Sequence, residues 1–224
     1  MTKTYLKRIA APKTWPLLRR TNVFITRPKP SGHPLAHTLP MVVIMREYLK
    51  MVKTARQAGR VLKANETLVN GRRVHTVMDS AGFMDIVSFG KHAYRILIDR
   101  NGMLTVTPVA KGQEFTIRRV MGKTVRKDGK VQLNLTGGMN LLADKHACKV
   151  GDGLVIKDGK ITEQLPLKEG ASVLVTGGSH IGAVGVIEKI EGKVITVKAD
   201  NESFLTTRAY TYVIGKGTPL ITIG

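Results

Sequence analysis

Hydrophobic residues follow the period of an α-helix from Leu39 onward. Apolar side chains recur at spacings of three, four and three positions, at Val42, Met45, Leu49 and Val52. Residues with this spacing lie on one face of a helix. The pattern therefore predicts an amphipathic helix with one apolar, buried face.

A second, shorter helix is expected from Thr54 to about Lys63. Thr54 and Gln57 match a capping box, in which the hydroxyl accepts a backbone N–H of the first turn and the glutamine side chain reaches back. Three residues would face inward: Ala55, Ala58 and Leu62. Three cations would face outward: Arg56, Arg60 and Lys63. The helix thus presents a basic face.

Strand patterns follow the two helices. Residues 68–72 read Leu-Val-Asn-Gly-Arg, and an Asn-Gly pair between such residues is the strongest short signal of a β-hairpin. Residues 85–89 form a further candidate strand. From about Tyr94 the helical period fades, and short apolar runs alternate with turns at Asn101-Gly102, Asp128-Gly129 and Asp158-Gly159. We expect this part to form small barrels or sandwiches, with boundaries near Asp99 and Leu167.

A glycine-rich segment separates two candidate strands near the C-terminus. Residues 173–176 and 183–187 are the strands, and residues 177–182 read Gly-Gly-Ser-His-Ile-Gly. Glycine permits positive φ and lets a partner approach the backbone closely. The segment resembles a KOW motif, a strand–loop–strand of an SH3-like barrel. That resemblance implies RNA contacts from Gly177, Gly178, His180 and Gly182. In the alternative interpretation, the segment is a plain hairpin whose glycines serve only the turn.

Charge narrows the class of partner. The 224 residues include 36 Lys and Arg against 16 Asp and Glu, a formal net charge of +20. Residues 1–78 hold 16 of these bases and two acids, a net charge of +14, and residues 79–224 hold 20 bases and 14 acids. Solvated surfaces usually mix both signs. A surplus gathered in the first third therefore indicates an anionic polymer or surface as partner.

The first 40 residues are expected to form an extended basic arm. They contain six prolines, which exclude the long amphipathic helix that basic membrane-surface segments adopt. Nucleic acid is therefore favoured over lipid. Phosphate contacts are expected from seven cations: Lys7, Arg8, Lys13, Arg19, Arg20, Arg27 and Lys29. Two aromatic residues, Tyr5 and Trp15, would either stack on bases or pack on the folded domain.

Catalytic, cofactor and metal motifs are not recognisable. No Walker sequence and no G-x-G-x-x-G surrounds the glycine-rich segment. His33 and His37 are four apart, as metal ligands on a helix would be, but Pro34 argues against a helix there. His146 lies near Cys148, the single cysteine, without an activating third group, so Cys148 is expected to be a small core residue.

These features carry further expectations about the class of protein. One cysteine permits no intrachain disulfide and fits a reducing cytoplasm. The longest apolar run, residues 41–45, is far too short to span a membrane, and the N-terminus does not match a secretory signal. We expect no cofactor, no metal, no small-molecule substrate and no membrane association.

The helix–helix–hairpin of residues 41–89 resembles the small RNA-binding module shared by many ribosomal and RNA-modifying proteins, the S-four-like fold. In that module the second helix and the following turn clamp RNA. The resemblance implies RNA contacts from Lys53, Thr54, Arg56, Gln57, Arg60, Arg72 and Arg73, beside Lys63 of the basic face. The alternative is an ordinary helical hairpin with a solvated basic face.

Five phrases in one order extend the resemblance to nearly the whole chain. They are LKRIAAPKTWPL, VNGRRV, AGFMDIVS, VLVTGGSHIGAVGVI and YVIGKG. Together they resemble small-subunit ribosomal protein four of the archaeal and eukaryotic type, the eS-four family, over about residues 6–217. The archaeal form is the closer match, because no basic C-terminal extension follows. Residues 122–151 match the family less closely.

The resemblance implies an α+β protein with four regions. They are the extended basic arm (1–40), the S-four-like module (41–98), a central β domain (99–167) and a KOW SH3-like barrel (168–224). It also implies a non-enzymatic role: binding rRNA and stabilising its fold in the small ribosomal subunit, beside neighbouring ribosomal proteins and without homo-oligomers. Two alternatives stay open, an RNA-modifying enzyme with the module as its RNA clamp and a KOW-type transcription elongation factor. The enzyme would need a larger catalytic domain than residues 99–167 supply, and the elongation factor would be less basic.

Overall fold

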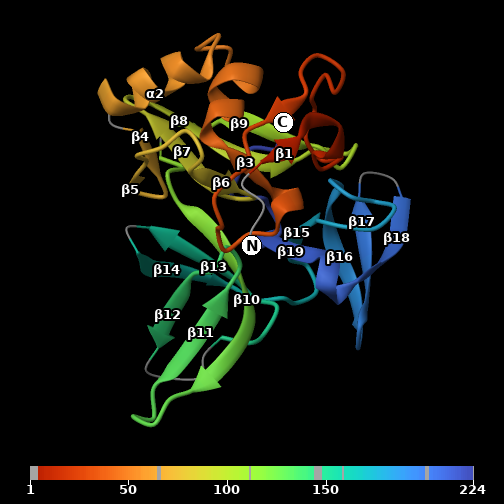
Figure 1. Ribbon diagram of the computed structural model, residues 1–224. Helices are drawn as coiled ribbons and strands as arrows, with labels where there is room; N and C mark the ends of the chain where they lie inside the picture. The colour runs from red at the N-terminus through yellow and green to blue at the C-terminus, as the bar shows by residue number, and fades with distance from the viewer. Residues whose placement is uncertain are drawn as a thin grey trace. The chain divides into compact units, whose positions relative to one another are not determined.

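Strands predominate in the structure. The computed structural model describes residues 5–64, 67–110, 112–143, 148–157, 159–199 and 202–223 (Figure 1). The chain forms two compact units. Unit 1 comprises Met1–Leu97 and Met103–Val109, and unit 2 comprises Ile98–Gly102 and Ala110–Gly224. The expected α+β class is confirmed, with few helices. His146 and Asp158 lie outside the described residues.

The N-terminal segment, residues 5–40, forms several short elements in unit 1. Strands β1 (Leu6–Lys7) and β2 (Phe24–Ile25) pair antiparallel. Two 3-10 turns, η1 (Arg8–Ala10) and η2 (Leu35–His37), interrupt the otherwise irregular backbone. Prolines that exclude a long helix are compatible with this succession of turns and extended stretches.

Aromatic residues of the N-terminal segment adopt different environments. The Trp15 side chain is 1% exposed, and Leu6 and Ile25 are buried as well. Tyr5 is exposed and lies edge-on to Phe24, with ring centroids 6.0 Å apart. The sequence left open whether Trp15 stacks on bases or packs on the folded domain; in the structure it packs on the domain.

The first helix is shorter than its pattern predicts, and its first five residues are buried all round. Helix α1 (Met41–Val43) continues into the π-helical turn η3 (Ile44–Tyr48), and residues 41–45 have no exposed side chain. Lys50 then has a positive φ of 52°, a conformation that ends helices. The expectation of a one-sided helix reaching Val52 is wrong, because a fully buried helix needs no polar face.

Helix α2 (Ala55–Ala64) begins with the expected capping box. Gln57 N donates to Thr54 Oγ1 at 3.2 Å, and Thr54 N donates to Gln57 Oε1 at 3.1 Å. Ala58 and Leu62 are buried, as predicted. Ala55 is exposed, contrary to expectation, because it lies in the first turn, which the core does not cover.

Unit 1 contains a five-stranded sheet of order β5-β4-β7-β8-β9. The strands are β4 (Thr67–Val69), β5 (Arg72–Arg73), β7 (Ile86–Phe89), β8 (His92–Ile98) and β9 (Leu104–Pro108). Asn70 and Gly71 connect β4 to β5 with φ of 50° and 79°, as a type I′ turn requires, so the hairpin is confirmed. A separate pair joins β3 (Thr38–Pro40) to β6 (Ser80–Gly82).

The first sheet of unit 2 has the order β12-β11-β10-β13-β14. Its strands are β10 (Thr116–Val125), β11 (Val131–Leu135), β12 (Asn140–Ala143), β13 (Gly153–Lys157) and β14 (Lys160–Leu165). One face buries an apolar cluster that includes Val120, Leu133 and Leu154. Cys148 lies in the same cluster, which confirms its expected core role.

The second sheet of unit 2 has the order β18-β17-β16-β15-β19. Its strands are β15 (Ser172–Val175), β16 (Val184–Glu191), β17 (Val194–Ala199), β18 (Glu202–Thr207) and β19 (Thr211–Gly215). β15 and β16 pair antiparallel across the glycine-rich loop, so the predicted strand–loop–strand is confirmed. Tyr212 Oη donates to Ile117 O at 2.6 Å and joins the two sheets.

Candidate nucleic-acid interface

Helix α2 presents a row of cations to solvent. Arg56, Arg60 and Lys63 are exposed, and Lys53, just before the helix, is exposed too. Residues three and four apart on a helix are neighbours on one face. The buried residues Ala58 and Leu62 fix the opposite face. The cations therefore lie on a rigid support and reach outward from it.

Thr54 and Gln57 are exposed, but their polar side-chain atoms serve the helix cap. Gln57 Oε1 accepts the N–H of Lys53 at 2.9 Å as well as that of Thr54. These hydrogen bonds satisfy backbone groups that the first turn leaves free. The pair thus fixes the direction in which Lys53 and Arg56 leave the helix.

Arg72 and Arg73 add two exposed cations at a sheet edge. They form β5, the outermost strand of its sheet, opposite Val69 and Leu68 of β4. The tight turn at Asn70 and Gly71 sets this register. Both arginines are exposed, so they remain available to a partner.

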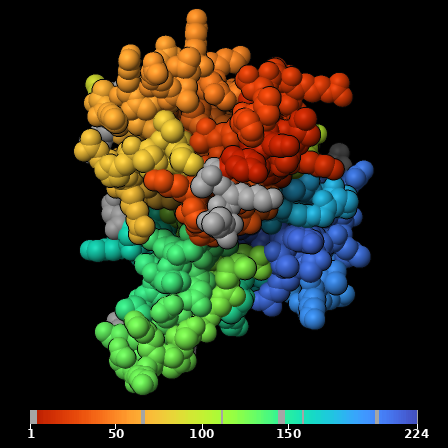
Figure 2. Space-filling model, in the orientation of Figure 1, coloured from red at the N-terminus to blue at the C-terminus, as the bar shows by residue number. Residues whose placement is uncertain are grey.

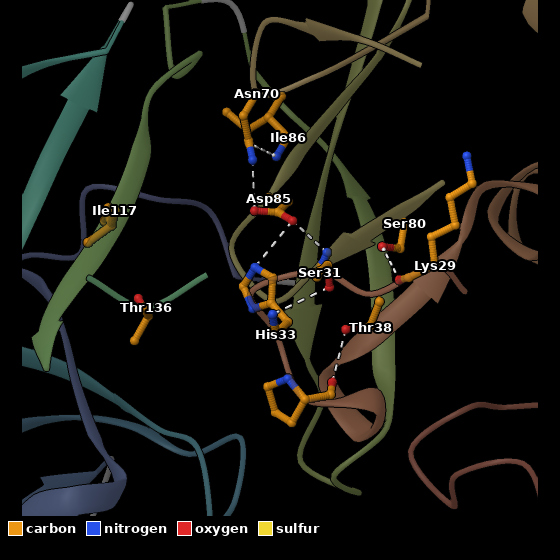
Figure 3. Close-up of polar contacts among 12 residues, drawn as sticks. Lys29, Ser31, His33, Thr38, Asn70, Ser80, Asp85, Ile86, Ile117 and Thr136 are labelled. Atoms are coloured by element: carbon orange, nitrogen blue, oxygen red, sulfur yellow. Dashed lines mark hydrogen bonds and ion pairs between the residues drawn. The ribbon is translucent and has the colours of Figure 1, made fainter. Parts of the chain in front are cut away.

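A buried carboxylate holds this hairpin and the N-terminal segment together (Figure 3). Asp85 is 4% exposed, and its Oδ1 accepts Asn70 Nδ2 at 2.8 Å. Its Oδ2 accepts the N–H of Gly82 at 2.6 Å and lies 3.3 Å from His33 Nε2. Asn70 Oδ1 in turn accepts the N–H of Ile86 at 2.9 Å. A buried charge is tolerable only when it is bonded in this way.

Of the two histidines considered as metal ligands, His33 has another partner. The His33 ring faces Asp85 and fills the space where a Cβ of Gly82 would lie. Burial lowers the pKa of His37, and the nearby His33 lowers it further. Within the described ranges, no group of three His, Cys, Asp or Glu side chains is arranged to hold a metal ion.

Two of the N-terminal arginines are engaged inside unit 1. Arg8 is 3% exposed, with Nη2 3.3 Å from Glu47 Oε1 and Nε donating to Leu18 O at 2.6 Å. Arg19 is half-buried and donates to three backbone carbonyls within residues 9–12. Both guanidinium groups hold the turns of the segment in place.

The other N-terminal cations face outward to different degrees. Lys7, Lys13, Arg20 and Lys29 are exposed, and Arg27 is half-buried. Lys29 Nζ lies 2.9 Å from Asp79 Oδ1. The exposed members extend the positive surface of unit 1 beyond α2 and β5.

Asp79 combines an ion pair with a local turn. Burial alone would raise the pKa of this carboxyl, but hydrogen bonds from the Thr76 hydroxyl, from Lys29 and from the N–H groups of Thr76 and His75 outweigh it, so the pKa falls below its usual range. The distances are 2.7 Å from Thr76 Oγ1 and 2.9 Å from both backbone nitrogens. Asp79 therefore stays ionised and holds its turn.

Close packing explains why two positions of the β15–β16 loop are glycine. A Cβ on Gly177 would lie 2.6 Å from the Tyr210 ring. Gly182 is buried at φ 78°, and a Cβ there would meet the backbone of Asp99 and Arg100. Gly178 is exposed at φ 89°, with only ordinary contacts around its missing side chain.

His180 is exposed at the tip of the same loop. Its ring stacks on Phe204, with centroids 4.1 Å apart and an interplanar angle of 14°. One face of the imidazole is therefore already covered. Phe204 was missed from the sequence, because its position in β18 becomes relevant only once β18 is known to lie near the loop.

The described residues include no helix long and apolar enough to cross a membrane.

Two family models match this chain. Residues 91–161 match the ribosomal family S4e, and residues 2–36 match the RS4NT domain.

Relatives and a solved structure extend the match over the whole chain. The small ribosomal subunit protein eS4 of Methanosphaera stadtmanae is 34% identical over 235 residues, which cover 99% of this chain and 96% of the relative. The protein of the same name from Methanocaldococcus jannaschii is 34% identical over 237 residues, 98% and 97% of the two chains. The crystal structure of the 30S ribosomal protein S4e from Thermoplasma acidophilum matches with a TM-score of 0.71 and 28% identity, over 80% of this chain and 96% of that one. With a third of its residues shared over nearly the full length of archaeal relatives, this chain belongs to the ribosomal protein S4e family.

Proposed function

We propose that this protein is a structural constituent of the small ribosomal subunit, in the archaeal cytoplasm, where it binds rRNA and stabilises its fold. The names of its relatives support the ribosomal assignment. The observation that carries the rRNA contact is the exposed cationic row of α2 on a buried apolar support. Backbone phosphates are the groups that such a surface neutralises.

The proposed phosphate contacts are the cations that unit 1 leaves exposed or half-buried. They are Lys7, Lys13, Arg20, Arg27, Lys29, Lys53, Arg56, Arg60, Lys63, Arg72 and Arg73. Arg8 and Arg19 hold the N-terminal segment, and Thr54 and Gln57 orient the start of α2. Planar guanidinium groups also stack on unpaired bases, which suits folded rRNA.

The glycine-rich loop is proposed to act as a KOW element of an SH3-like barrel. Its strand–loop–strand order and the exposed Gly178 and His180 support an RNA contact there. Gly177 and Gly182 shape the loop from inside. The division of the chain at residues 40, 98 and 167 stays a prediction, as does a direct contact with neighbouring ribosomal proteins.

The family is structural, so the protein is not an enzyme. The two alternative functions, an RNA-modifying enzyme and a transcription elongation factor, have no support in the relatives described above, which are named as ribosomal proteins.

Sedimentation tests the proposal directly. A tagged copy in the native organism should co-sediment with small subunits through a sucrose gradient and remain bound after a moderate salt wash. The Kd for purified small-subunit rRNA should rise steeply with salt. A protein found only at the top of the gradient would contradict the ribosomal role.

A further inference from the structure

The β10–β11 hairpin, here called the ribbon, extends beyond strand β13, while β12 accompanies β11 along residues 131–134. Strand β13 pairs only with residues 116–119 of β10, whereas β11 pairs with residues 120–125. The ribbon ends in a tight turn, where Arg126 N donates to Lys130 O at 2.9 Å. In Figure 1 this green hairpin forms one end of its sheet, and Figure 2 shows atoms of the same green segment at the surface.

Strand alternation gives the ribbon two unlike faces. Val125 pairs with Val131, and Val131 and Leu133 belong to the apolar cluster. The other face carries Thr124 opposite Gln132. Successive side chains of a strand point to opposite faces. The second face is therefore the one turned away from the core.

Hydrogen bonds order the polar side chains of this outer face. Gln132 Nε2 donates to Asn134 Oδ1 at 2.9 Å, and Asn134 Nδ2 donates to Thr124 Oγ1 at 3.3 Å. Asn140 of β12 lies opposite Asn134 and continues the row of amides. Each of these groups has donor or acceptor capacity beyond the bonds it makes here.

Cations complete the outer face at the turn. Arg126 and Lys130 face each other two residue pairs beyond Thr124 and Gln132, with Val125 and Val131 between, so alternation places them on the same face. Both are exposed, as is Lys127 in the turn. Asp128 is the only acid between residues 122 and 143. The surplus of charge on the ribbon is therefore positive.

A glycine leaves the backbone of the outer face open. Gly122 pairs with Asn134, and a Cβ there would meet only Asn134 Nδ2, at 3.8 Å. The fold therefore has room for a side chain at Gly122. Glycine within a strand often marks the close approach of another backbone or a ligand.

We propose that this outer face, here called the ribbon face (Gly122, Thr124, Arg126, Lys130, Gln132 and Asn134), is a further RNA-binding site that takes the minor groove of an rRNA duplex. The assignment rests on the proposed ribosomal function. Arg126 and Lys130 contact phosphates, while the amides of Gln132 and Asn134 bond to 2′-hydroxyl groups. The minor groove of A-form RNA is wide, shallow and lined with 2′-hydroxyls. From the cations to Gly122 the face spans four residues, about 13 Å.

Chemistry favours RNA over a protein partner on this face. Its named side chains are cations, amides and a hydroxyl, whereas Val131 and Leu133 of the ribbon are buried in the apolar cluster. Two apolar residues of β10 are exposed, Val125 on the opposite face and Met121 at the bulge beside Gly122. Leu142 of β12, opposite Gln132, is an exposed apolar side chain beside this face. Protein interfaces bury apolar centres depleted in charge. The ribbon face has the opposite composition.

Binding to defined duplexes tests the assignment. The purified protein would be titrated with an RNA duplex of about 20 base pairs and with a DNA duplex of the same sequence, at several salt concentrations. The double substitution Arg126→Ala with Lys130→Ala should weaken RNA binding and lower the salt slope by about 1.5 to 2. Gln132→Ala with Asn134→Ala should reduce the preference for RNA over DNA. An unchanged slope and an unchanged preference would overturn the inference.

Two further variants are controls. They test whether misfolding or a general loss of positive charge explains the weaker binding. Gly122→Leu adds an apolar side chain in open space, so it should weaken RNA binding while the urea midpoint of unfolding stays within the wild-type range. Lys193→Ala removes an exposed cation at the β16–β17 turn of the same unit, outside the ribbon face. It should change the slope by much less. Equal effects of Lys193→Ala and the double substitution would contradict a specific site.

The same variants separate this inference from the proposed function. Failure of the wild-type protein to bind small-subunit rRNA would overturn the proposed function. Binding of wild type and of the Arg126→Ala, Lys130→Ala variant with the same Kd would overturn the ribbon site alone. Loss of that variant from small subunits without any change in RNA affinity would indicate a protein partner and would also overturn the RNA site.

Discussion

Helix α2 and the β15–β16 loop were both expected to contact RNA, but they are built in opposite ways. On α2, the side chains that would bind are exposed, and the residues behind them are buried. In the loop, Gly177 and Gly182 are required by the packing of Tyr210 and Asp99. A glycine-rich segment therefore indicates, in the first place, close packing of the backbone. A row of cations without neighbouring acids indicates an anionic partner.

The N-terminal and C-terminal parts of the chain also differ in net charge. Residues 1–78 have 16 bases and two acids, whereas residues 168–224 have six bases and five acids. The second sheet of unit 2 therefore has little long-range attraction for phosphate. A contact made there depends on shape and stacking and should respond weakly to salt.

The largest expected effect comes from removing cations of the α2 surface. Replacing Arg56, Arg60 and Arg72 with Ala should raise the Kd for small-subunit rRNA at least about a hundredfold, because each charged hydrogen bond contributes roughly 1.5 kcal/mol or more. The slope of log K against log salt should fall by about 2 to 3. Filter binding over a salt series measures both.

Stability provides the control for the triple substitution. All three side chains are exposed, so the urea midpoint should stay nearly unchanged. An unaltered salt slope would show that α2 and β5 do not contact phosphate. These elements would then not differ from the β15–β16 loop in electrostatic binding to RNA.

A smaller effect, on stability instead of binding, is expected from Gly182→Ala. The new methyl group would meet the backbone of Asp99 and Arg100, and the position has a positive φ. We expect a loss of about 2–4 kcal/mol in the free energy of unfolding. Urea denaturation monitored by circular dichroism measures this loss.

Gly178→Ala is the matched control in the same loop. It also has a positive φ, but no neighbour closer than 3.8 Å would meet its Cβ. Backbone strain alone should cost about 1 kcal/mol. If both variants lost the same stability, the close approach at Gly182 would not be the reason for that glycine.

An effect smaller than that of Gly182→Ala is expected from Asp79→Asn in unit 1. The substitution removes a charged acceptor of several hydrogen bonds and should cost about 1–3 kcal/mol at pH 7. Because folding lowers the pKa of Asp79, its contribution is complete above the usual aspartate pKa of about 4 and is lost as pH falls through the lower folded value.

A pH series of unfolding curves checks the origin of this contribution. The wild type should lose stability below about pH 4 more steeply than Asp79→Asn does. Parallel curves would mean that the carboxylate charge of Asp79 does not stabilise unit 1. The difference between unit 1 and the β15–β16 loop would then rest on the exposed cations of unit 1 alone.

Local patterns were readable from the sequence where one segment supplies all the interacting groups. The capping box of Thr54 and Gln57, the buried pair Ala58 and Leu62, and the Asn70-Gly71 turn all follow from neighbours within a few residues. The same holds for the outward cations of α2, which need only the helical period.

Non-local packing explains what the sequence did not reveal. The run from Met41 to Met45 is buried on every side by distant segments, so no periodicity marks its burial. Arg8 reads as one cation among many, and only Glu47 and the Leu18 carbonyl make it an internal residue. Asp85 likewise gains two of its partners, Asn70 and His33, from segments that are distant in the sequence.

The place of Asp85 has a consequence for synthesis of the chain. Residues 1–46, which carry no acid, leave a translating ribosome before the segment that contains Asp85, the partner of His33. Domains fold as units only when their later strands emerge. Until then the N-terminal segment is a polycation without its carboxylate partners, and it lies near the surface of a translating ribosome. That surface is rich in rRNA phosphates. Final packing of His33 against Asp85 therefore has to compete with early, unspecific capture of this segment by RNA.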